Sequence, residues 1–140
     1  MLNRRKNKAI KHGRHWTRSL DKVSEMKLDD EKILSIVQKT LEDNKADDVI
    51  VMDLRGKTSL ASYMVVASGT SQRHVASLAE KVQTNLKNEG YKSIAEGEEK
   101  ADWVLIDAFD VIIHLFKPEV REFYNIEKMW QAVVKSRPEE

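Results

Sequence analysis

Two short apolar runs lie next to each other in the second half of the chain and give its clearest structural signal. Residues 103–108 and 111–116 are rich in β-branched and large apolar side chains, and only Phe109-Asp110 separates them. Runs of this length and composition are typical of β-strands. Because their apolar character is almost continuous, we expect both strands to lie near the middle of a sheet that is covered on both faces.

Apolar residues at helical spacing predict three helices. The first follows Asp29 or Asp30, either of which suits the N-cap position, and the second follows Ser71 as its N-cap. The third begins at Pro118, since proline fits the first turn of a helix. The expected buried positions are Ile33, Ile36, Val37 and Leu41 in the first helix, Val75, Leu78, Ala79, Val82 and Leu86 in the second, and Val120, Phe123, Ile126, Trp130 and Val133 in the third.

Three further strands complete the pattern. Residues 48–54 are typical of a buried strand that ends in a turn, residues 63–68 form a second strand, and residues 91–95 form a short third one. The predicted order is therefore α-β-β-α-β-β-β-α. It describes an α/β fold with an α+β-like order of elements, in which helices flank a single mixed β-sheet.

The composition fits one globular domain. The chain has 140 residues, of which 41% are hydrophobic and 34% are charged. It contains no apolar run long enough to span a bilayer and no apolar signal-peptide core, so we expect no membrane association. Because it has no cysteine, disulfides, thiolate metal sites and cysteine nucleophiles are excluded, and a reducing compartment, most simply the cytoplasm, is expected.

The net charge of +1 conceals an asymmetry along the chain. The first 20 residues contain no acidic side chain, whereas residues 21–140 hold 17 basic and 23 acidic groups. The basic residues at the start are Arg4, Arg5, Lys6, Lys8, Lys11, Arg14 and Arg18. We therefore divide the chain into a basic N-terminal arm, residues 1–27, which we expect to be flexible, and a domain, residues 28–140.

Three interpretations of the arm remain open. It is a solubilising terminus, a polycation that contacts RNA phosphates, or a transit peptide, since its first 20 residues are rich in arginine and free of acids. The third interpretation would place the protein in an organelle instead of the cytoplasm.

Gly69-Thr70-Ser71 joins a strand to a helix, and backbone amides at such a junction can bind phosphate. Together with carboxylates on a later strand, this would suggest a metal-dependent nucleotidyltransferase. However, Asp107 and Asp110 are three residues apart, so a continuous strand would place them on opposite faces, and only a bend at Phe109 would bring them together. A capped helix start is the simpler interpretation of residues 69–71.

His74 and His114 are the only histidines in residues 28–140, and neither has metal-ligand spacing to another candidate ligand. His114 is interpreted as a hydrogen-bonded structural residue or, alternatively, as a catalytic base. Trp103 follows four carboxylates, Glu96, Glu98, Glu99 and Asp102. It either closes the edge of the core or anchors an interface with a basic partner. With no nucleophile motif or metal cluster, the sequence favours a protein that is not an enzyme.

Three separated motifs together resemble the motifs of one known family. They are Gly69-Thr70-Ser71-Gln72-Arg73-His74-Val75, then Ala101-Asp102-Trp103 with Asp107-Ala108-Phe109-Asp110-Val111-Ile112-Ile113-His114, and finally Arg121-Glu122-Phe123-Tyr124-Asn125-Ile126-Glu127-Lys128-Met129-Trp130. In this order they resemble the Iojap family, the ribosomal silencing factors. The resemblance covers about residues 30–130 and includes a first hairpin region at residues 53–63.

The resemblance implies a nucleotidyltransferase-like sheet without catalytic carboxylates, and no cofactor. It implies a factor that binds the large ribosomal subunit through large-subunit protein fourteen, sterically blocks joining of the small subunit and represses translation, mainly under nutrient limitation. The residues that it assigns to partner contact are Trp103, Asp107, Ala108, Asp110, His114 and Tyr124. The basic arm lies outside the resemblance and is a candidate for contact with ribosomal RNA. A homodimer of the free protein remains open, and a metal-dependent nucleotidyltransferase is the alternative function.

One motif departs from the family pattern. The family usually has Leu-Gly before the second aspartate, where this chain has Ala108-Phe109. The smaller Ala108 would reduce apolar contact with a partner, and Phe109 would have to replace it.

Overall fold

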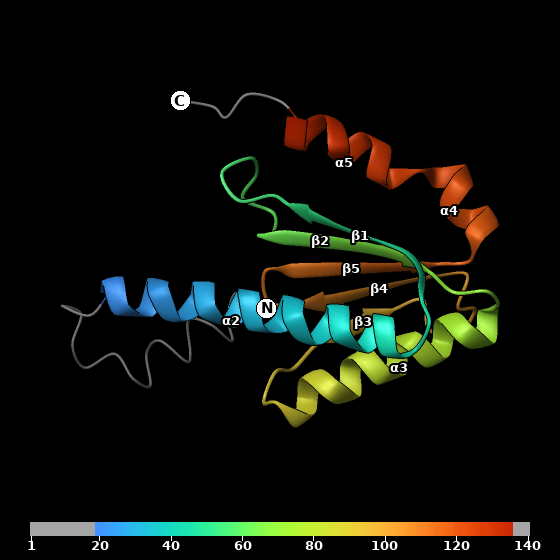
Figure 1. Ribbon diagram of the computed structural model, residues 1–140, viewed down its shortest axis with the longest axis horizontal. Helices are drawn as coiled ribbons and strands as arrows, with labels where there is room; N and C mark the ends of the chain where they lie inside the picture. Colours follow the sequence, from blue (N-terminus) through green and yellow to red (C-terminus); the bar gives the residue numbers. More distant parts are fainter. Residues whose placement is uncertain (1–18, 136–140) are drawn as a thin grey trace.

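The computed structural model describes residues 19–135, with side chains from residue 29 onward, and shows one sheet with helices on both faces (Figure 1). None of the helices in this part of the chain is both long and apolar enough to cross a membrane. The elements are α2 (Ser19–Asp43), β1 (Asp47–Asp53), β2 (Tyr63–Ser68), α3 (Gln72–Asn88), β3 (Ile94–Glu96), β4 (Trp103–Ala108), β5 (Val111–Phe116), α4 (Pro118–Tyr124) and α5 (Ile126–Lys135).

The strands form a single mixed sheet in the order β1-β2-β5-β4-β3, which confirms the predicted fold class. β2 and β5 run parallel, and the other neighbouring pairs are antiparallel. The β4–β5 hairpin has the predicted boundaries, with Ala108 paired to Val111 on either side of the turn. β5 is the central strand, and most of its side chains are buried on both faces, as expected.

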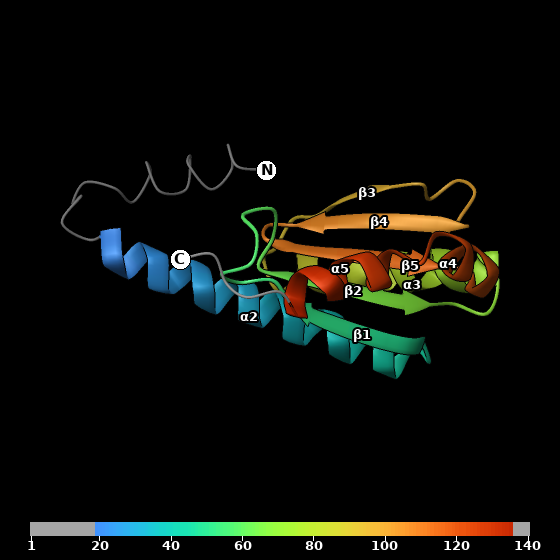
Figure 2. The same ribbon diagram turned by 90° about the horizontal axis from the view of Figure 1, so that it is seen from above.

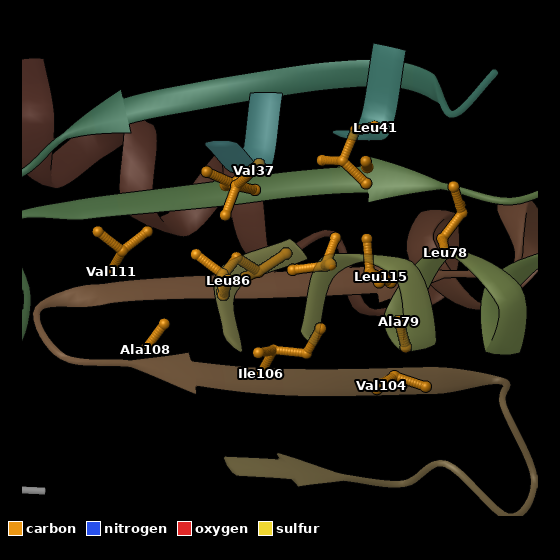
Figure 3. Close-up of a cluster of buried hydrophobic side chains, with 14 of the residues drawn as sticks. Val37, Leu41, Leu78, Ala79, Leu86, Val104, Ile106, Ala108, Val111 and Leu115 are labelled. Atoms are coloured by element: carbon orange, nitrogen blue, oxygen red, sulfur yellow. The ribbon is translucent and has the colours of Figure 1, made fainter. Parts of the chain in front are cut away.

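Helices α2 and α3 cover one face of the sheet, which we call the closed face (Figures 1 and 3). The apolar stripe predicted for α3 is fully buried here, and Ser71 is its N-cap as predicted, since its side chain accepts a hydrogen bond from the His74 amide at 3.1 Å. Val104, Ile106 and Ala108 of β4 point into the same core and have no exposed surface.

Helices α4 and α5 cover only part of the opposite face (Figure 2). Their apolar residues pack over β1, β2 and β5, where the buried side chains include Met52, Met64 and Phe116. In Figure 2, β3 and β4 lie beside these helices and are not covered by them. We call this uncovered part, formed by β3, β4 and the adjoining side of β5, the open half-face.

The short third strand begins at Ile94, three residues later than predicted, and four further details of the prediction are wrong. The first helix begins at Ser19, ten residues before Asp29, so neither aspartate is a cap. Instead, Asp29 accepts a hydrogen bond from the Tyr91 hydroxyl at 3.0 Å, and Asp30 accepts one from Ser62 at 3.0 Å. Residues 20–28 have no helix breaker, so helix extension costs little there.

The second and third corrections concern strands. β1 is an edge strand with mostly exposed or partly exposed side chains, although residues 48–54 were predicted to be a buried strand. β4 is buried on the closed face only, because its alternate side chains lie on the open half-face.

The fourth correction concerns the last helix, which is two helices. Asn125 adopts a left-handed conformation with φ of 45° and ends α4. This break changes the direction of the chain, so the helical stripe predicted across it does not stay on one face. Phe123, predicted to be buried, is 80% exposed, whereas Val120, Ile126 and Trp130 do pack against the sheet.

Candidate functional site

Trp103 lies at the boundary between the open half-face and the part covered by α4 and α5. It is the first residue of β4 and pairs with Phe116 of β5, so both side chains are on the same face of the sheet. The two rings stack with centroids 4.9 Å apart. Tyr124, from the end of α4, contacts the indole as well, with a centroid distance of 4.9 Å and an angle of 44° between the rings. Trp103 therefore joins the sheet to α4.

His114 completes this aromatic cluster. The Trp103 Nε1–H donates a hydrogen bond of 3.0 Å to His114 Nδ1, and the imidazole ring stacks on Phe116 with centroids 6.0 Å apart. Only 9% of the His114 surface is exposed. Burial disfavours the charged imidazolium and lowers the pKa of His114 to about 4, so the ring is neutral near pH 7. His114 is thus a hydrogen-bonded structural residue, one of the two interpretations drawn from the sequence.

A buried ion pair fixes α4 and α5 in the position that brings Tyr124 to Trp103. Arg121 is 7% exposed; its Nε donates to Glu127 at 2.9 Å, and one of its terminal nitrogens donates to Ser68 Oγ at 2.8 Å. Asn125 donates its amide hydrogen to the Arg121 carbonyl at 2.7 Å. The Arg121–Trp130 motif therefore builds the junction between the two helices and ties it to the end of β2.

An acidic loop borders the other side of Trp103. Glu98, Glu99 and Asp102 line an open hollow of about 570 Å³ that also includes Gly97 and Trp103. Gly97 has a φ of +88°, and a Cβ at this position would collide with the Trp103 carbonyl oxygen, so only glycine fits this turn. Asp102 accepts a hydrogen bond from Gln72 at 2.8 Å and lies 3.8 Å from the Lys117 ammonium, which fixes the end of the loop.

The structure brings three of the predicted partner-binding residues together, namely Trp103, His114 and Tyr124. Asp107 is on the same face of β4 as Trp103, four residues further along, or about 13 Å at the usual strand rise. Ala108 is fully buried on the closed face. Asp110 is in the β4–β5 turn, at the opposite end of the hairpin from Trp103, where its carbonyl accepts the Ser62 amide at 2.7 Å.

The basic residues predicted to contact RNA, Arg4, Arg5, Lys6, Lys8, Lys11, Arg14 and Arg18, lie outside the described residues. Their contact with RNA therefore stays a prediction.

The Gly69 junction is a helix start held by its own hydrogen bonds. Gly69 donates to the Phe116 carbonyl at 2.9 Å, and Thr70 donates to His74 Nδ1 at 2.9 Å, so these amides are not available to a phosphate. A Cβ on Gly69 would approach Val75 Cγ2 to 2.8 Å, which accounts for the glycine. Asp107 and Asp110 do not converge on this junction, and the described residues contain no cluster of three potential metal ligands. The geometry therefore gives the nucleotidyltransferase alternative no support.

Two apolar positions that are not fully buried, one partly exposed and one exposed, were missed by the sequence prediction. Leu105 is partly exposed, lies between Trp103 and Asp107 on the open half-face, and pairs with His114 of β5. Phe123 packs edge-on against Tyr124 with centroids 5.0 Å apart and extends the aromatic cluster into solvent. The position of Asp107 was a usable signal for Leu105, because a carboxylate two residues along a strand indicates that the shared face is open.

Comparison with known proteins gives a consistent result along most of the chain. A family model described as "Ribosomal silencing factor during starvation" matches residues 27–140. A ribosomal silencing factor of Zymomonas mobilis is 47% identical over 113 residues, which cover 80% of this chain and 85% of that protein. A mouse protein named "Mitochondrial assembly of ribosomal large subunit protein 1" is 35% identical over 95 residues, covering 64% of this chain and 41% of that protein.

A solved structure shares the fold as well as the sequence. The crystal structure of a Chromobacterium violaceum protein is similar with a TM-score of 0.70 at 40% identity, and the match covers 78% of this chain and 89% of that one. The family match spans all three sequence motifs, the hairpin and the junction between α4 and α5. The chain therefore belongs to the ribosomal silencing factor family.

Proposed function

We propose that this protein binds the large ribosomal subunit through the open half-face and thereby prevents the small subunit from joining, which represses translation. The observation that carries the proposal is the partly exposed cluster of Trp103 and Tyr124 beside an acidic loop, in a chain of the ribosomal silencing factor family. Tryptophan and tyrosine are enriched among the residues that dominate binding energy at interfaces. The mechanism is occupancy of a surface, with no chemical step, and the cytoplasm is the expected site of action.

The proposed direct partner is large-subunit protein fourteen, as the family resemblance implies. The carboxylates of the acidic loop suit a basic partner surface, because charges of opposite sign across an interface speed association and fix its orientation. Trp103, Leu105 and Tyr124 would supply the apolar centre, with Asp107 beside them. A contact that also reaches Asp110 would have to run the length of the β4–β5 hairpin, about 20 Å at the usual strand rise, which is within the span of an ordinary protein interface.

Ala108 and His114 cannot serve as direct contacts in this arrangement, since their side chains are buried. Ala108 belongs to the core beneath the proposed contact surface. Its small size therefore affects the packing of the hairpin on α3 more than the apolar area offered to a partner.

Co-sedimentation with isolated subunits tests the proposal. We expect the wild-type protein to pellet with large subunits, to remain in solution with small subunits, and to lower the yield of joined ribosomes. Tyr124→Ala should weaken binding at least about 10-fold, and Trp103→Ala at least about 30-fold, the effect of losing an interface anchor of about 2 kcal/mol. Glu80→Ala, an exposed change on α3 at the opposite side of the sheet, is the matched control and should bind normally.

Two results would contradict the proposal. One is equal binding by wild type and both aromatic variants, provided that the variants melt at temperatures close to that of wild type. The other is magnesium-dependent transfer from a nucleoside triphosphate that is lost in Asp107→Ala, which would favour the nucleotidyltransferase alternative. A titration with isolated large-subunit protein fourteen separates direct contact with that protein from contact with RNA.

We also propose that the basic arm contacts ribosomal RNA. Removal of residues 1–18, which ends before α2, would delete the seven basic residues predicted to contact RNA and leave the described elements intact. Because phosphate neutralisation releases counterions, the truncated protein should show a flatter dependence of large-subunit binding on salt, and it should still block subunit joining. Equal salt slopes for the two proteins would indicate that the arm makes no such contact.

A further inference from the structure

The hydrogen bond between Trp103 and His114 connects a partly exposed side chain to a buried one. The indole Nε1 donates to His114 Nδ1, with 3.0 Å between the two nitrogens. Because His114 is only 9% exposed, the edge of the indole that carries this N–H is directed toward a buried group and not toward solvent. An indole nitrogen can only donate, so Nδ1 must be the acceptor in this pair. The neutral ring then carries its proton on Nε2. His114 is therefore held in one tautomer by its contact with Trp103.

The other contacts of the Trp103 side chain are apolar packing and stacking on two rings, which do not by themselves fix the indole within its plane. Phe116 and Tyr124 both lie 4.9 Å from the indole, with angles of 28° and 44° between the planes. Stacked rings can slide or turn over one another at small energetic cost, whereas a hydrogen bond has a preferred direction. The His114 acceptor is thus the directional contact that selects one orientation of the indole between its two aromatic neighbours.

We infer that His114 is a positioning residue, which fixes the orientation of the Trp103 indole for partner binding and makes no contact with the partner itself. This inference rests on the proposed function, because it assigns a role within the same surface. The burial of His114 supports it: the imidazole is on the same face as its cross-strand neighbour Leu105, but only 9% of His114 is exposed, so a partner would meet little of the ring. Without the acceptor, the indole N–H would be unsatisfied in a partly buried position and would turn toward water.

Loss of the acceptor should weaken binding without removing any contact atom. A ring that must be ordered on association lowers affinity, and one immobilised side chain typically changes the dissociation constant about tenfold or less. We therefore expect His114→Phe, which keeps a ring of similar size and removes the acceptor, to weaken large-subunit binding by about tenfold. His114→Asn should recover most of this loss, because its side-chain oxygen can take the place of Nδ1.

The first readout is the Trp103 indole N–H resonance of the free protein, assigned by its absence in Trp103→Phe. We expect this resonance to shift toward the position of a solvent-exposed indole in His114→Phe and to return toward its wild-type position in His114→Asn. An unchanged resonance in His114→Phe would overturn the inference. This measurement needs no ribosome, so it remains informative if wild-type protein fails to bind subunits, a result that would contradict the proposed function instead.

The second readout is a double-mutant cycle in the co-sedimentation assay. If His114 acts only through Trp103, then His114→Phe should cause no further loss of binding in a Trp103→Phe background. A further tenfold loss in that background would mean that His114 contacts the partner or supports another contact, and the inference would be wrong. If His114→Phe fails to fold, the same comparison is made with His114→Leu, with His114→Asn as the variant that retains an acceptor.

Discussion

The two faces of the sheet differ in how completely helices cover them. On the closed face, α2 and α3 lie across the strands, and the side chains of β2, β4 and β5 that point toward them have almost no exposed surface. On the other face, α4 and α5 cover β1, β2 and part of β5 and leave the open half-face beside them (Figure 2). β4 takes part in both environments, since its side chains alternate between partly exposed and buried.

This difference separates stability from recognition within a single strand. A fully covered face stabilises the fold by removing apolar surface from water, whereas an apolar patch that stays exposed is typical of a site for binding another molecule. The boundary between the two roles passes through Trp103, which packs on the covered half and lines the acidic hollow. The predictions below test this boundary in order of expected effect.

The largest effect on folding free energy is expected from breaking the ion pair that holds α4 and α5 on the sheet. Glu127→Ala would leave the buried Arg121 guanidinium without its carboxylate partner, and the loss of one member of a buried pair typically costs about 3 kcal/mol of folding free energy or more. Chemical denaturation should show this loss. Glu122→Ala, an exposed change on α4 next to Arg121, is the control and should stay within about 0.5 kcal/mol of wild type. Equal stability of the two variants would mean that the ion pair does not hold α4 and α5 on the sheet.

Two adjacent residues of β4, Leu105 and Ile106, should lose different properties when each is replaced by alanine. Ile106→Ala removes apolar contacts from the closed face and should cost about 3 kcal/mol of folding free energy. Leu105→Ala, on the open half-face, should cost less than about 1 kcal/mol because its side chain remains partly exposed when folded. Under the proposed function, Leu105→Ala should instead weaken binding to large subunits. Similar losses of stability in both variants would remove the distinction between the faces.

His114 should make folding stability depend on pH. Its pKa is about 4 in the folded protein and 6.5 in the unfolded chain, so the unfolded chain binds more protons between these values. Stability is therefore complete above pH 6.5, falls as the pH falls toward 4, and changes no further from this group below that. Between pH 7 and pH 5 the loss should be about 2 kcal/mol, and it should be absent in His114→Phe. A slope that survives in His114→Phe would assign it to other groups.

The smallest effect on folding free energy is expected in the turn between β4 and β5. Phe109 has a φ of 58°, a conformation that a side chain with a Cβ rarely adopts, and its ring packs edge-on against Tyr91 at 6.0 Å. Phe109→Gly and Phe109→Ala both lose the ring, but only glycine relieves the strain. Phe109→Gly should therefore be the more stable variant by about 1 kcal/mol in thermal or chemical unfolding. The opposite order would show that the turn is not strained by a Cβ.

Much of the candidate site was visible in local sequence patterns. Trp103 beside a group of carboxylates indicated either the edge of the core or an interface anchor, and its contact with Tyr124 shows that the two separated motifs meet in space. The pattern could not show which face of β4 is covered and which is open, because residues 103–108 were predicted to be buried on both faces, so it could not separate Ala108 from Asp107. Nor could it show that Phe123 is exposed, since helical spacing assumes a continuous helix, and Asn125 interrupts it.

The sequence by itself determined the elements whose signals are local. The stripe of α3, the Ser71 cap and the boundaries of β2, β4 and β5 follow from side-chain periodicity and capping chemistry, which act within a few residues. Only the tertiary structure decided which strand lies at the edge, how far α4 and α5 extend across the sheet, and which side of β4 stays open. These properties depend on contacts between residues far apart in the chain, such as Arg121 with Ser68 and Trp103 with His114, and no local pattern specifies such pairs.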